Sequence, residues 1–553
     1  MKTTLASVLL ALFCGAAHAT TLTVTNTTDS GPGSLRNAIA EANFGGGPNT
    51  VNIIVTGTIV LTSGSIQIAS PLTIVGPGAD KLTIDGNAKS NIFTVFVTDP
   101  ACPAQDGPDY LVSISGLRLT NGLRDGRSGG AIFSEHSLLL DAVLIDKNVA
   151  GIGGGAMVQF QYPGQTLTIT NSQFLNNTAR PVTTNPSVTD SGGALLLEQK
   201  CANTRFTPAS ASISNSVFSG NRAQPTTLSA IGGAVGAFAY VDYTISDTRI
   251  VDNHVDVPNP PLAGRLYRGG GISFGNVKSA TIVRSEISNN STIDATSGGV
   301  TQGGGLVLVN AAPDLQAPSS ATAVNIINSK IVGNADSALG GGIYVYGNVA
   351  VNVDSSTISN NTAPTTKTGG IFLTTGPTAP ASAANAAPPT LAFASSTVAN
   401  NTTYDIATSV IPALAVYASN SQTGTICSTC NISVVNGPAP LVPQVGLWWN
   451  PNESGSGYSF DVKHNTLVVT IYSYTGTGAS QWYLSSAPLS ADGTTFTGTL
   501  DKYVNGQCIS CAYQGRPALV GSDGNITVKF NSATSATVTL PGGRVTQIQP
   551  QAF

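Results

Sequence analysis

The densest group of residues with the chemistry for acid–base catalysis lies in the segment RIVDNHVDV, which contains Asp252, His254 and Asp256. Arg265 and Arg268 follow this segment after a Pro-rich insertion. A histidine flanked by carboxylates can move a proton, and arginine can stabilise negative charge that develops in a transition state. This segment, together with Arg268, is therefore the candidate catalytic group.

A second set of candidates is aromatic. All three tryptophans lie in the last part of the chain, where they alternate with apolar residues. Aromatic rings offer large contact areas for stacking on sugar rings at low entropic cost. The candidate glycan-binding residues are Trp448, Trp449, Trp482 and Tyr483, to which Tyr472 and Tyr474 could add a platform. The alternative, which the alternation favours, is that these rings form the core of their own domain.

The cysteines allow two kinds of site. An even number remains after the expected export signal, and an oxidising compartment favours disulfides. The disulfide candidates are Cys102, Cys201, Cys427, Cys430, Cys508 and Cys511. The two Cys-x-x-Cys pairs are also typical of a four-thiolate zinc site, but the long gap between them and the exported setting favour disulfides. We expect no metal or other cofactor.

A repeat must position these residues. An apolar residue followed three places later by asparagine recurs at intervals of 27 to 44 residues, and a glycine pair that leads into an apolar run alternates with it. Such intervals are typical of repeat architectures. The repeated asparagines are Asn148, Asn177, Asn221, Asn253, Asn290, Asn334, Asn361 and Asn401.

Segments within each repeat, such as TLTIT and YTIS, alternate apolar and polar residues with the period of a strand. A single coil of short strands cannot bury its own apolar face, so coils must stack in parallel. This predicts an all-β fold, a right-handed parallel β-helix. Equivalent asparagines then lie above one another as a ladder whose amides bond to each other, and we expect them to adopt the left-handed corner conformation. The glycine pairs mark another corner.

The N-terminal residues predict export and a capped solenoid. Lys2, the apolar run from Leu5 to Phe13 and the sequence Ala17-His18-Ala19 form the pattern of a cleaved signal peptide over residues 1–19. The segment GSLRNAIAEAN departs from the strand pattern and predicts a short helix, with Ser34 as its N-cap, that covers the end of the core. Net charge is −4 without a basic run, which excludes nucleic acid as an expected partner, and no run is long enough for a membrane span.

Two resemblances support this architecture. GSLRNAIAEAN resembles the Ser-Leu-Arg-Glu-Ala segment of secreted bacterial right-handed β-helix proteins, although Gly33 replaces Cys and Asn37 replaces Glu. The alternation of Gly-Gly-Ala/Ile with Phe-x-x-Asn is similar to the repeats of chlamydial polymorphic outer membrane proteins, which implies an adhesive β-helix passenger. Nothing here resembles the C-terminal membrane barrel of those proteins.

The repeat stops after Val434. We assign residues 20–433 to the β-helix, 434–445 to a Pro-rich linker and 446–553 to a C-terminal module, in which alternating segments and Gly/Asn/Asp turns predict an antiparallel meander or small barrel. Its opening, GLWWNPNESGSGYS, resembles the Gly-x-Trp-Trp-x-Pro-x-Glu-x-Gly-x-Gly module appended to many secreted proteobacterial proteins. That module implies secretion and no defined activity.

Three functions are compatible with these observations. The first is a secreted or cell-surface protein, noncatalytic, that binds an extracellular glycan or surface protein through loops such as 179–191, 222–231 and 254–268. The second is a polysaccharide lyase or glycoside hydrolase, whose calcium-binding acidic cluster or paired carboxylates the repeats do not display, and calcium would enter only with this alternative. The polygalacturonase-like signatures are also absent. The third is a carbohydrate-binding module on a solenoid stalk.

Overall fold

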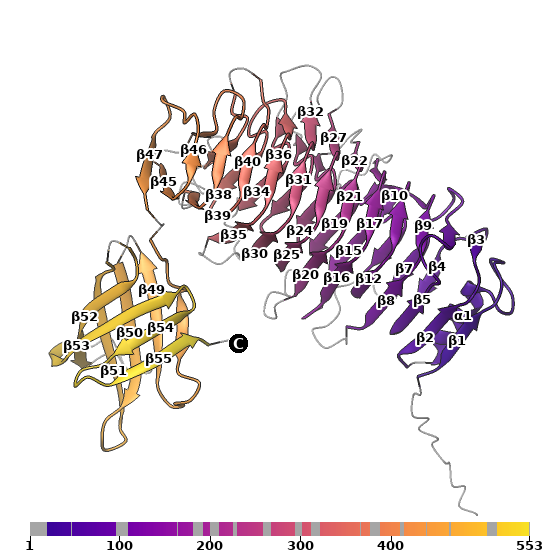
Figure 1. Ribbon diagram of the computed structural model, residues 1–553. Coiled ribbons are helices and arrows are strands. Elements are labelled where there is room, and N and C mark those ends of the chain that lie inside the picture. The colour runs from indigo at the N-terminus through magenta and orange to yellow at the C-terminus, as the bar shows by residue number, and fades with distance from the viewer. Residues whose placement is uncertain are drawn as a thin grey trace, which may run out of the picture. The chain divides into compact units, whose positions relative to one another are not determined.

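A computed structural model gives the architecture of the chain (Figure 1). It describes residues 19–45, 47–95, 109–162, 164–180, 192–199, 209–224, 229–257, 267–293, 301–310, 321–364, 367–375, 388–409, 414–437, 440–463, 466–490, 492–505 and 517–551. The chain divides into two compact units, Met1–Val416 with Asn420–Val434, and Tyr417–Ser419 with Val435–Phe553. Cys102, Cys201, Cys508, Cys511 and Arg265, and nearly all of the expected signal peptide, lie outside the described residues.

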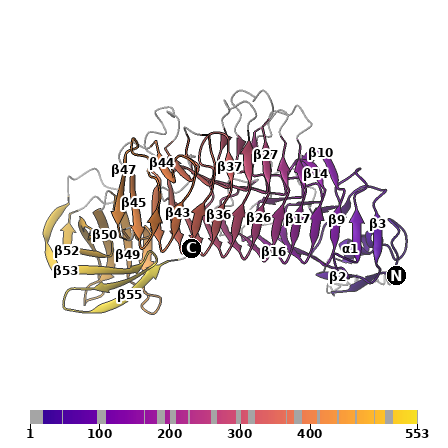
Figure 2. The same ribbon diagram turned by 45° about the horizontal axis from the view of Figure 1, so that its top comes forward.

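The first unit is a parallel β-helix, which confirms the predicted fold class. Three long parallel sheets form its walls, and from β2 to β44 each coil contributes one strand to each of them (Figures 1 and 2). We call them sheets A, B and C.

Sheet A contains β1 (Thr21–Val24), β2 (Asn49–Ile53), β5 (Leu72–Val75), β8 (Leu111–Ser115), β12 (Ser137–Asp141), β16 (Thr166–Thr170), β20 (Ser210–Ser214), β25 (Asp242–Ser246), β30 (Ser279–Val283), β35 (Thr322–Ile327), β39 (Val349–Asp354), β42 (Thr390–Ala394), β45 (Leu414–Ser419) and β47 (Ile432–Asn436). Sheet B contains β3 (Gly57–Val60), β6 (Leu82–Asp85), β9 (Arg118–Thr120), β13 (Leu144–Asp146), β17 (Gln173–Leu175), β21 (Val217–Ser219), β26 (Arg249–Val251), β31 (Glu286–Ser288), β36 (Lys330–Val332), β40 (Thr357–Ser359), β43 (Thr397–Ala399) and β46 (Gln422–Thr423). Sheet C contains β4 (Ile66–Ile68), β7 (Phe93–Val95), β11 (Ile132–Ser134), β15 (Ala156–Phe160), β19 (Leu195–Gln199), β24 (Val235–Phe238), β29 (Ile272–Gly275), β34 (Leu306–Asn310), β38 (Ile343–Gly347), β41 (Ile371–Thr374) and β44 (Ile406–Thr408).

Two shorter sheets interrupt the path from sheet B to sheet C and bury a small core of their own, formed by Ala223, Ala230, Val255 and Tyr267. Sheet D contains β10 (Leu123–Ser128), β14 (Val149–Ile152), β18 (Thr178–Ala179), β22 (Arg222–Ala223), β27 (His254–Asp256), β32 (Ser291–Ile293) and β37 (Ala335–Asp336). Sheet E contains β23 (Ala230–Ile231), β28 (Tyr267–Arg268) and β33 (Thr301–Gln302).

The predicted helix covers the first coils. Helix α1 (Leu35–Gly45) buries the expected face of Leu35, Ala38, Ile39 and Ala42 against the apolar column. The Ser34 hydroxyl accepts a hydrogen bond from the backbone N–H of Asn37 at 3.2 Å, which satisfies one of the free donors of the first turn. The described residues contain no helix that is long and apolar enough to cross a membrane.

The asparagines form a continuous ladder inside the corner between sheets B and D. The side-chain Nδ2 of each donates to the Oδ1 of the next, at 2.8–3.0 Å from Asn148 through to Asn401. The last member, Asn401, donates to the carboxylate of Asp405 at 2.7 Å. A carboxylate suits this end because it only accepts hydrogen bonds and, unlike an amide, has no N–H group that needs a further acceptor.

The prediction that the ladder asparagines adopt the left-handed conformation is wrong. The residue with positive φ is the one before each ladder asparagine, because the ladder side chain is committed to its neighbours and the turn is made one position earlier. These residues are Lys147, Asn176, Gly220, Asp252, Asn289, Gly333, Asn360 and Asn400, with φ between 54° and 67°. Most are Asn, Asp or Gly, the types that tolerate this conformation best.

A second ladder, not predicted from the sequence, lines the corner between sheets A and B. Its members are Ser172, Ser216, Thr248, Ser285, Ser329, Ser356 and Ser396. Each hydroxyl accepts a hydrogen bond from the backbone N–H one coil earlier, as between Ser285 and Thr248 at 3.2 Å, and donates to the carbonyl two residues before it, as from Ser285 to Val283 at 2.9 Å. The ladder therefore satisfies corner groups that neither sheet reaches.

Asp336, in the last strand of sheet D, gives the solenoid a pH dependence. Its carboxylate is buried, and burial raises its pKa to about 7 although the backbone N–H groups of Ala338 and Leu339 donate to it. The folded protein then holds a proton between about pH 4 and pH 7 that the unfolded chain has released, so stability falls as the pH rises through this range.

We expect Asp336→Asn to remove this part of the pH dependence, which is on the order of 2–4 kcal/mol for a shift of this size. The measurement is denaturant unfolding of the solenoid at pH 5 and pH 8. The matched control is Asp354→Asn, an exposed acid on sheet A, which should leave the difference between the two pH values unchanged. An Asp336→Asn protein with the pH dependence of the parent contradicts the assignment.

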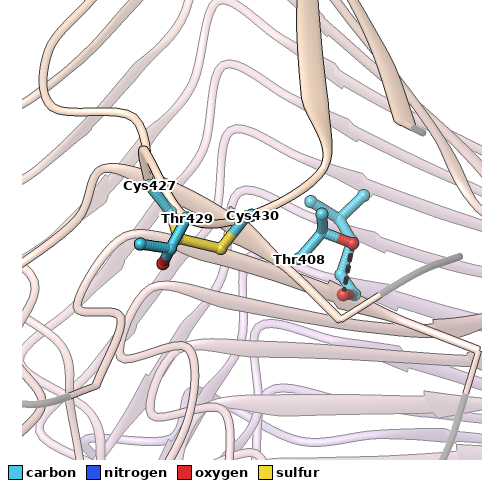
Figure 3. Close-up of a disulfide and its surroundings, with 5 residues drawn as sticks. Thr408, Cys427, Thr429 and Cys430 are labelled. Carbon is cyan, nitrogen blue, oxygen red and sulfur yellow. Dashed lines mark hydrogen bonds between the residues drawn. A yellow bond between two sulfur atoms is a disulfide. The ribbon is translucent and has the colours of Figure 1, made fainter.

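A disulfide joins Cys427 and Cys430 in the last coil, as Figure 3 shows. The backbone N–H of Cys427 donates to the carbonyl of Ile406 at 3.0 Å, so the disulfide turn follows directly on the end of sheet C. Neither sulfur is a thiolate in this state, and a zinc site built on this pair is incompatible with it.

The second unit is a closed antiparallel barrel, also as the fold class predicted. Its strands are β48 (Gly446–Trp449), β49 (Gly457–Lys463), β50 (Thr466–Tyr474), β51 (Ser480–Pro488), β52 (Thr495–Val504), β53 (Ala518–Ser532), β54 (Ser535–Thr539) and β55 (Val545–Pro550). Neighbours in sequence pair with each other, and β48 pairs with β55 to close the barrel. Glu453 in the opening motif binds Arg544 at 2.8 Å, which ties the first turn of the barrel to the turn before its last strand.

Candidate functional site

The candidate catalytic residues lie on two different sheets. His254 and Asp256 lie on β27 on either side of the buried Val255, so their side chains point to the outer face of sheet D. Asp252 has positive φ and forms the corner before this strand. Arg268 lies on β28 in sheet E, where its Nε donates to Gln302 at 2.5 Å. Burial raises the pKa of Tyr344 to about 12, and the positive charge of Arg268 opposes this shift.

The polar side chains of β27 are bound to neighbouring coils. Asp256 accepts from Arg222 at 3.1 Å and from Gln224 at 2.9 Å, and the Nδ1 of His254 lies 2.6 Å from the Ser291 hydroxyl. Burial and the Arg222 charge lower the pKa of His254 against the opposing effect of the two aspartates, which favours a neutral imidazole at pH 7. Each of these contacts links one coil to the next. The described residues hold no group of three or more His, Cys, Asp or Glu side chains placed to bind a metal.

The aromatic candidates of the barrel divide between its inside and its outside. Trp448 is 1% exposed and packs with Phe460 and Phe530 in the core, and its Nε1 donates to the carbonyl of Gln444 at 2.8 Å. Its indole is therefore not available to a ligand. Trp449 is half-buried.

Tyr483 is also committed to the barrel. It packs against the core and its hydroxyl donates to Asp523 at 2.7 Å. This hydrogen bond and burial raise the pKa of Tyr483 to about 12. Asp523 also pairs with Lys502 at 2.5 Å, so the phenol belongs to a side-chain network of the protein itself.

Trp482 faces the other way, and it is part of a row of aromatic side chains that crosses the outer face. It is 44% exposed, and its register partner on β50 is Tyr472, which is 49% exposed. On the other side its ring lies 5.9 Å from that of Tyr503, with only 12° between the two planes. We call Tyr472, Trp482 and Tyr503 the outer aromatic row.

The strand pattern explains this placement. In β50 the residues Leu467, Val469 and Ile471 are buried, so Tyr472 falls on the opposite face. Adjacent antiparallel strands then bring side chains of one face into a line perpendicular to the strands. Tyr503 was not a candidate from the sequence, although alternation along β52 from the buried Phe496 and Leu500 places it on the outer face. The bulge beside it lies in the partner strand β53, where Val520 is the extra residue.

The comparisons with known proteins do not identify the chain. No protein-family model matches it, and no curated protein matches it. Among solved structures, one match is a "Siphovirus 9NA tailspike receptor binding domain", with 10% sequence identity, a TM-score of 0.23, and coverage of 96% of this chain and 98% of that one. A similarity at this level supports no inference about the function of this chain.

Proposed function

We propose that this chain is an exported, noncatalytic surface protein whose barrel binds glycan, with the β-helix as its rigid support. One observation carries the proposal, the outer aromatic row. Large aromatic side chains are normally buried in a small barrel, whereas Tyr472 and Trp482 are 49% and 44% exposed on the outer face. Tyr503, which is half-buried, lies beside Trp482. Aromatic faces stack on the apolar faces of sugar rings, which is a common basis of carbohydrate recognition.

The solenoid supports this proposal by what its polar residues do. The repeated asparagines and serines are bound in the two ladders, and His254 and Asp256 of β27 bind the neighbouring coils. These are the roles of a stiff scaffold. The export signal remains a prediction that agrees with a surface location. The predicted loops at 222–231 and 254–268 begin and end in strands β22, β23, β27 and β28, so they are shorter than the sequence indicated.

The test is binding of the full chain to an array of plant, fungal and bacterial glycans. We expect Trp482→Ala to weaken binding about tenfold or more, because one lost aromatic stack is worth about 1.5 kcal/mol. The control is Phe44→Ala, which removes an aromatic side chain that is 93% exposed on α1 of the solenoid. Binding that survives Trp482→Ala, or is lost equally in Phe44→Ala, contradicts the proposal.

A further inference from the structure

The outer aromatic row has a direction. It runs across β50, β51 and β52, since Tyr472 pairs with Trp482 and Tyr503 stacks beside Trp482. Leu519 on β53, the register partner of Tyr503, continues it and is 58% exposed. At the other end Gly457 of β49 pairs with Tyr472 and offers no side chain to block the line.

The length of the row excludes a single sugar as its full ligand. Neighbouring strands lie about 4.8 Å apart, so the three rings alone extend over roughly 10 Å, and Leu519 adds one more strand. The ring planes of Trp482 and Tyr503 are nearly parallel, so the two rings have the same orientation along the row. An extended chain of several rings matches this geometry.

The charges beside the row are few and negative. The next outward position along the strands is the line formed by Thr470, Leu484, Asp501 and Ser522, in which Leu484 pairs with Asp501 and Asp501 pairs with Ser522. The line on the other side of the row holds Tyr474 and its register partner Ser480. Among the described residues of the row and these two flanking lines, Asp501 is the one charged side chain. Lys502, its neighbour in sequence, is paired with Asp523.

A carboxylate at this position selects between sugars. It can accept strong, charge-assisted hydrogen bonds from sugar hydroxyls, which are donors. It repels the carboxylate of a uronic acid and offers that group no partner. Asp501 therefore favours neutral chains over acidic ones.

From these observations, and resting on the proposed function, we infer that the outer aromatic row binds a neutral, extended glycan chain of several sugar residues that lies across β50–β53, with Asp501 as a specificity-determining residue. Chains with equatorial linkages fit best, because their rings present flat faces along a straight ribbon.

The experiment compares matched ligands on the full chain by calorimetry. The neutral ligands are hexasaccharides of β-1,4-linked glucose and mannose, and the acidic ones are the same chains oxidised to glucuronate and mannuronate. We expect the neutral chain of at least one pair to bind about tenfold more tightly than its acidic counterpart. Affinity should also rise from disaccharide to hexasaccharide.

Two variants locate the effect. Asp501→Asn should narrow the preference to within about threefold, and Asp501→Lys should reverse it. The control is Asp461→Asn. Asp461 is an exposed acid on the outer face of β49, two positions beyond Ser459, which pairs with Thr470 of the flanking line. This substitution should leave the preference for neutral over acidic chains unchanged. Near-ultraviolet circular dichroism of each variant verifies that the barrel is folded.

The outcomes separate the two proposals. Acidic chains that bind as well as neutral ones, through Trp482, overturn the neutral preference and leave the proposed function intact. The same holds for a preference that Asp501→Asn and Asp501→Lys do not alter. Failure of every hexasaccharide to bind overturns the inference, and the proposed function falls with it if the glycan array is also blank.

Discussion

Replacement of Asn253 by alanine is expected to lower the free energy of unfolding of the solenoid by about 3–5 kcal/mol. The Oδ1 of Asn253 accepts from the backbone N–H and the side chain of Asn221 at 3.0 and 2.8 Å, and its Nδ2 donates to Asn290 at 2.9 Å. It also donates to the carbonyls of Phe218 and Val251. Alanine removes the acceptor of the backbone N–H of Asn221 and takes one hydrogen bond from each of the other groups, although Asn290 keeps the backbone N–H of residue 253. A buried group left without a partner costs about 1–3 kcal/mol.

The measurement is urea unfolding monitored by circular dichroism. Asn352→Ala is the matched control, because Asn352 is an exposed asparagine whose one amide contact, to Asn325 at 3.1 Å, lies on the surface of sheet A. Its effect should stay within about 0.5 kcal/mol. A loss below about 1 kcal/mol in Asn253→Ala contradicts the structural role of the ladder.

Gly233→Ala is expected to destabilise the solenoid by about 3 kcal/mol or more. A Cβ atom at this position would lie 2.1 Å from the carbonyl oxygen of Gly270 and 2.8 Å from the backbone of His254. Both obstacles are main chain, which cannot rotate away as a side chain can. The coil must therefore shift against its neighbour and disturb the parallel register on both sides.

Gly476→Ala is the comparison, since Gly476 has no positive φ and open space around the site of the added carbon. We expect this substitution to change stability by less than about 0.5 kcal/mol. Thermal unfolding of both variants provides the test. If Gly233→Ala were as well tolerated as Gly476→Ala, the coils would not approach each other as closely as the structure indicates.

The architecture was predictable because a solenoid repeats the same sequence motifs in every coil. One apolar residue followed by asparagine means little, but eight in alternation with glycine pairs fix the wall strands and the ladder from Asn148 to Asn401. The capping helix was predictable for a local reason, since Ser34 and the apolar face from Leu35 to Ala42 form a complete start signal.

Two features of the solenoid were missed although the sequence contains a signal for them. The serine ladder occupies the position two residues before the apolar residue of each motif, as in NSVF and NSKI, and its small polar side chains pass for ordinary turn residues. The left-handed corner was assigned one residue too late, because the asparagine that repeats most strictly is the one that bonds along the ladder.

The candidate site was predictable only in part. Alternation shows that half of the barrel residues face inward, but it does not show which face of β50 or β51 is the inner one until the whole barrel is closed. Trp448 and Trp482 therefore look equivalent in the sequence, whereas one is in the core and the other outside. Tyr503 lies three positions after the buried Leu500, so alternation along β52 places it outside once Leu500 is known to face the core.

The most direct test of a glycan site on the outer aromatic row is acrylamide quenching of tryptophan fluorescence. It is measured with and without a neutral β-1,4-linked hexasaccharide that the protein binds. Of the three indoles, Trp482 is the most exposed, so it contributes the largest share of the accessible emission. We predict that saturating ligand protects this emission from acrylamide, and that Trp482→Phe abolishes the protection. Accessibility of Trp482 that is unchanged at saturation would contradict a glycan site on the outer aromatic row.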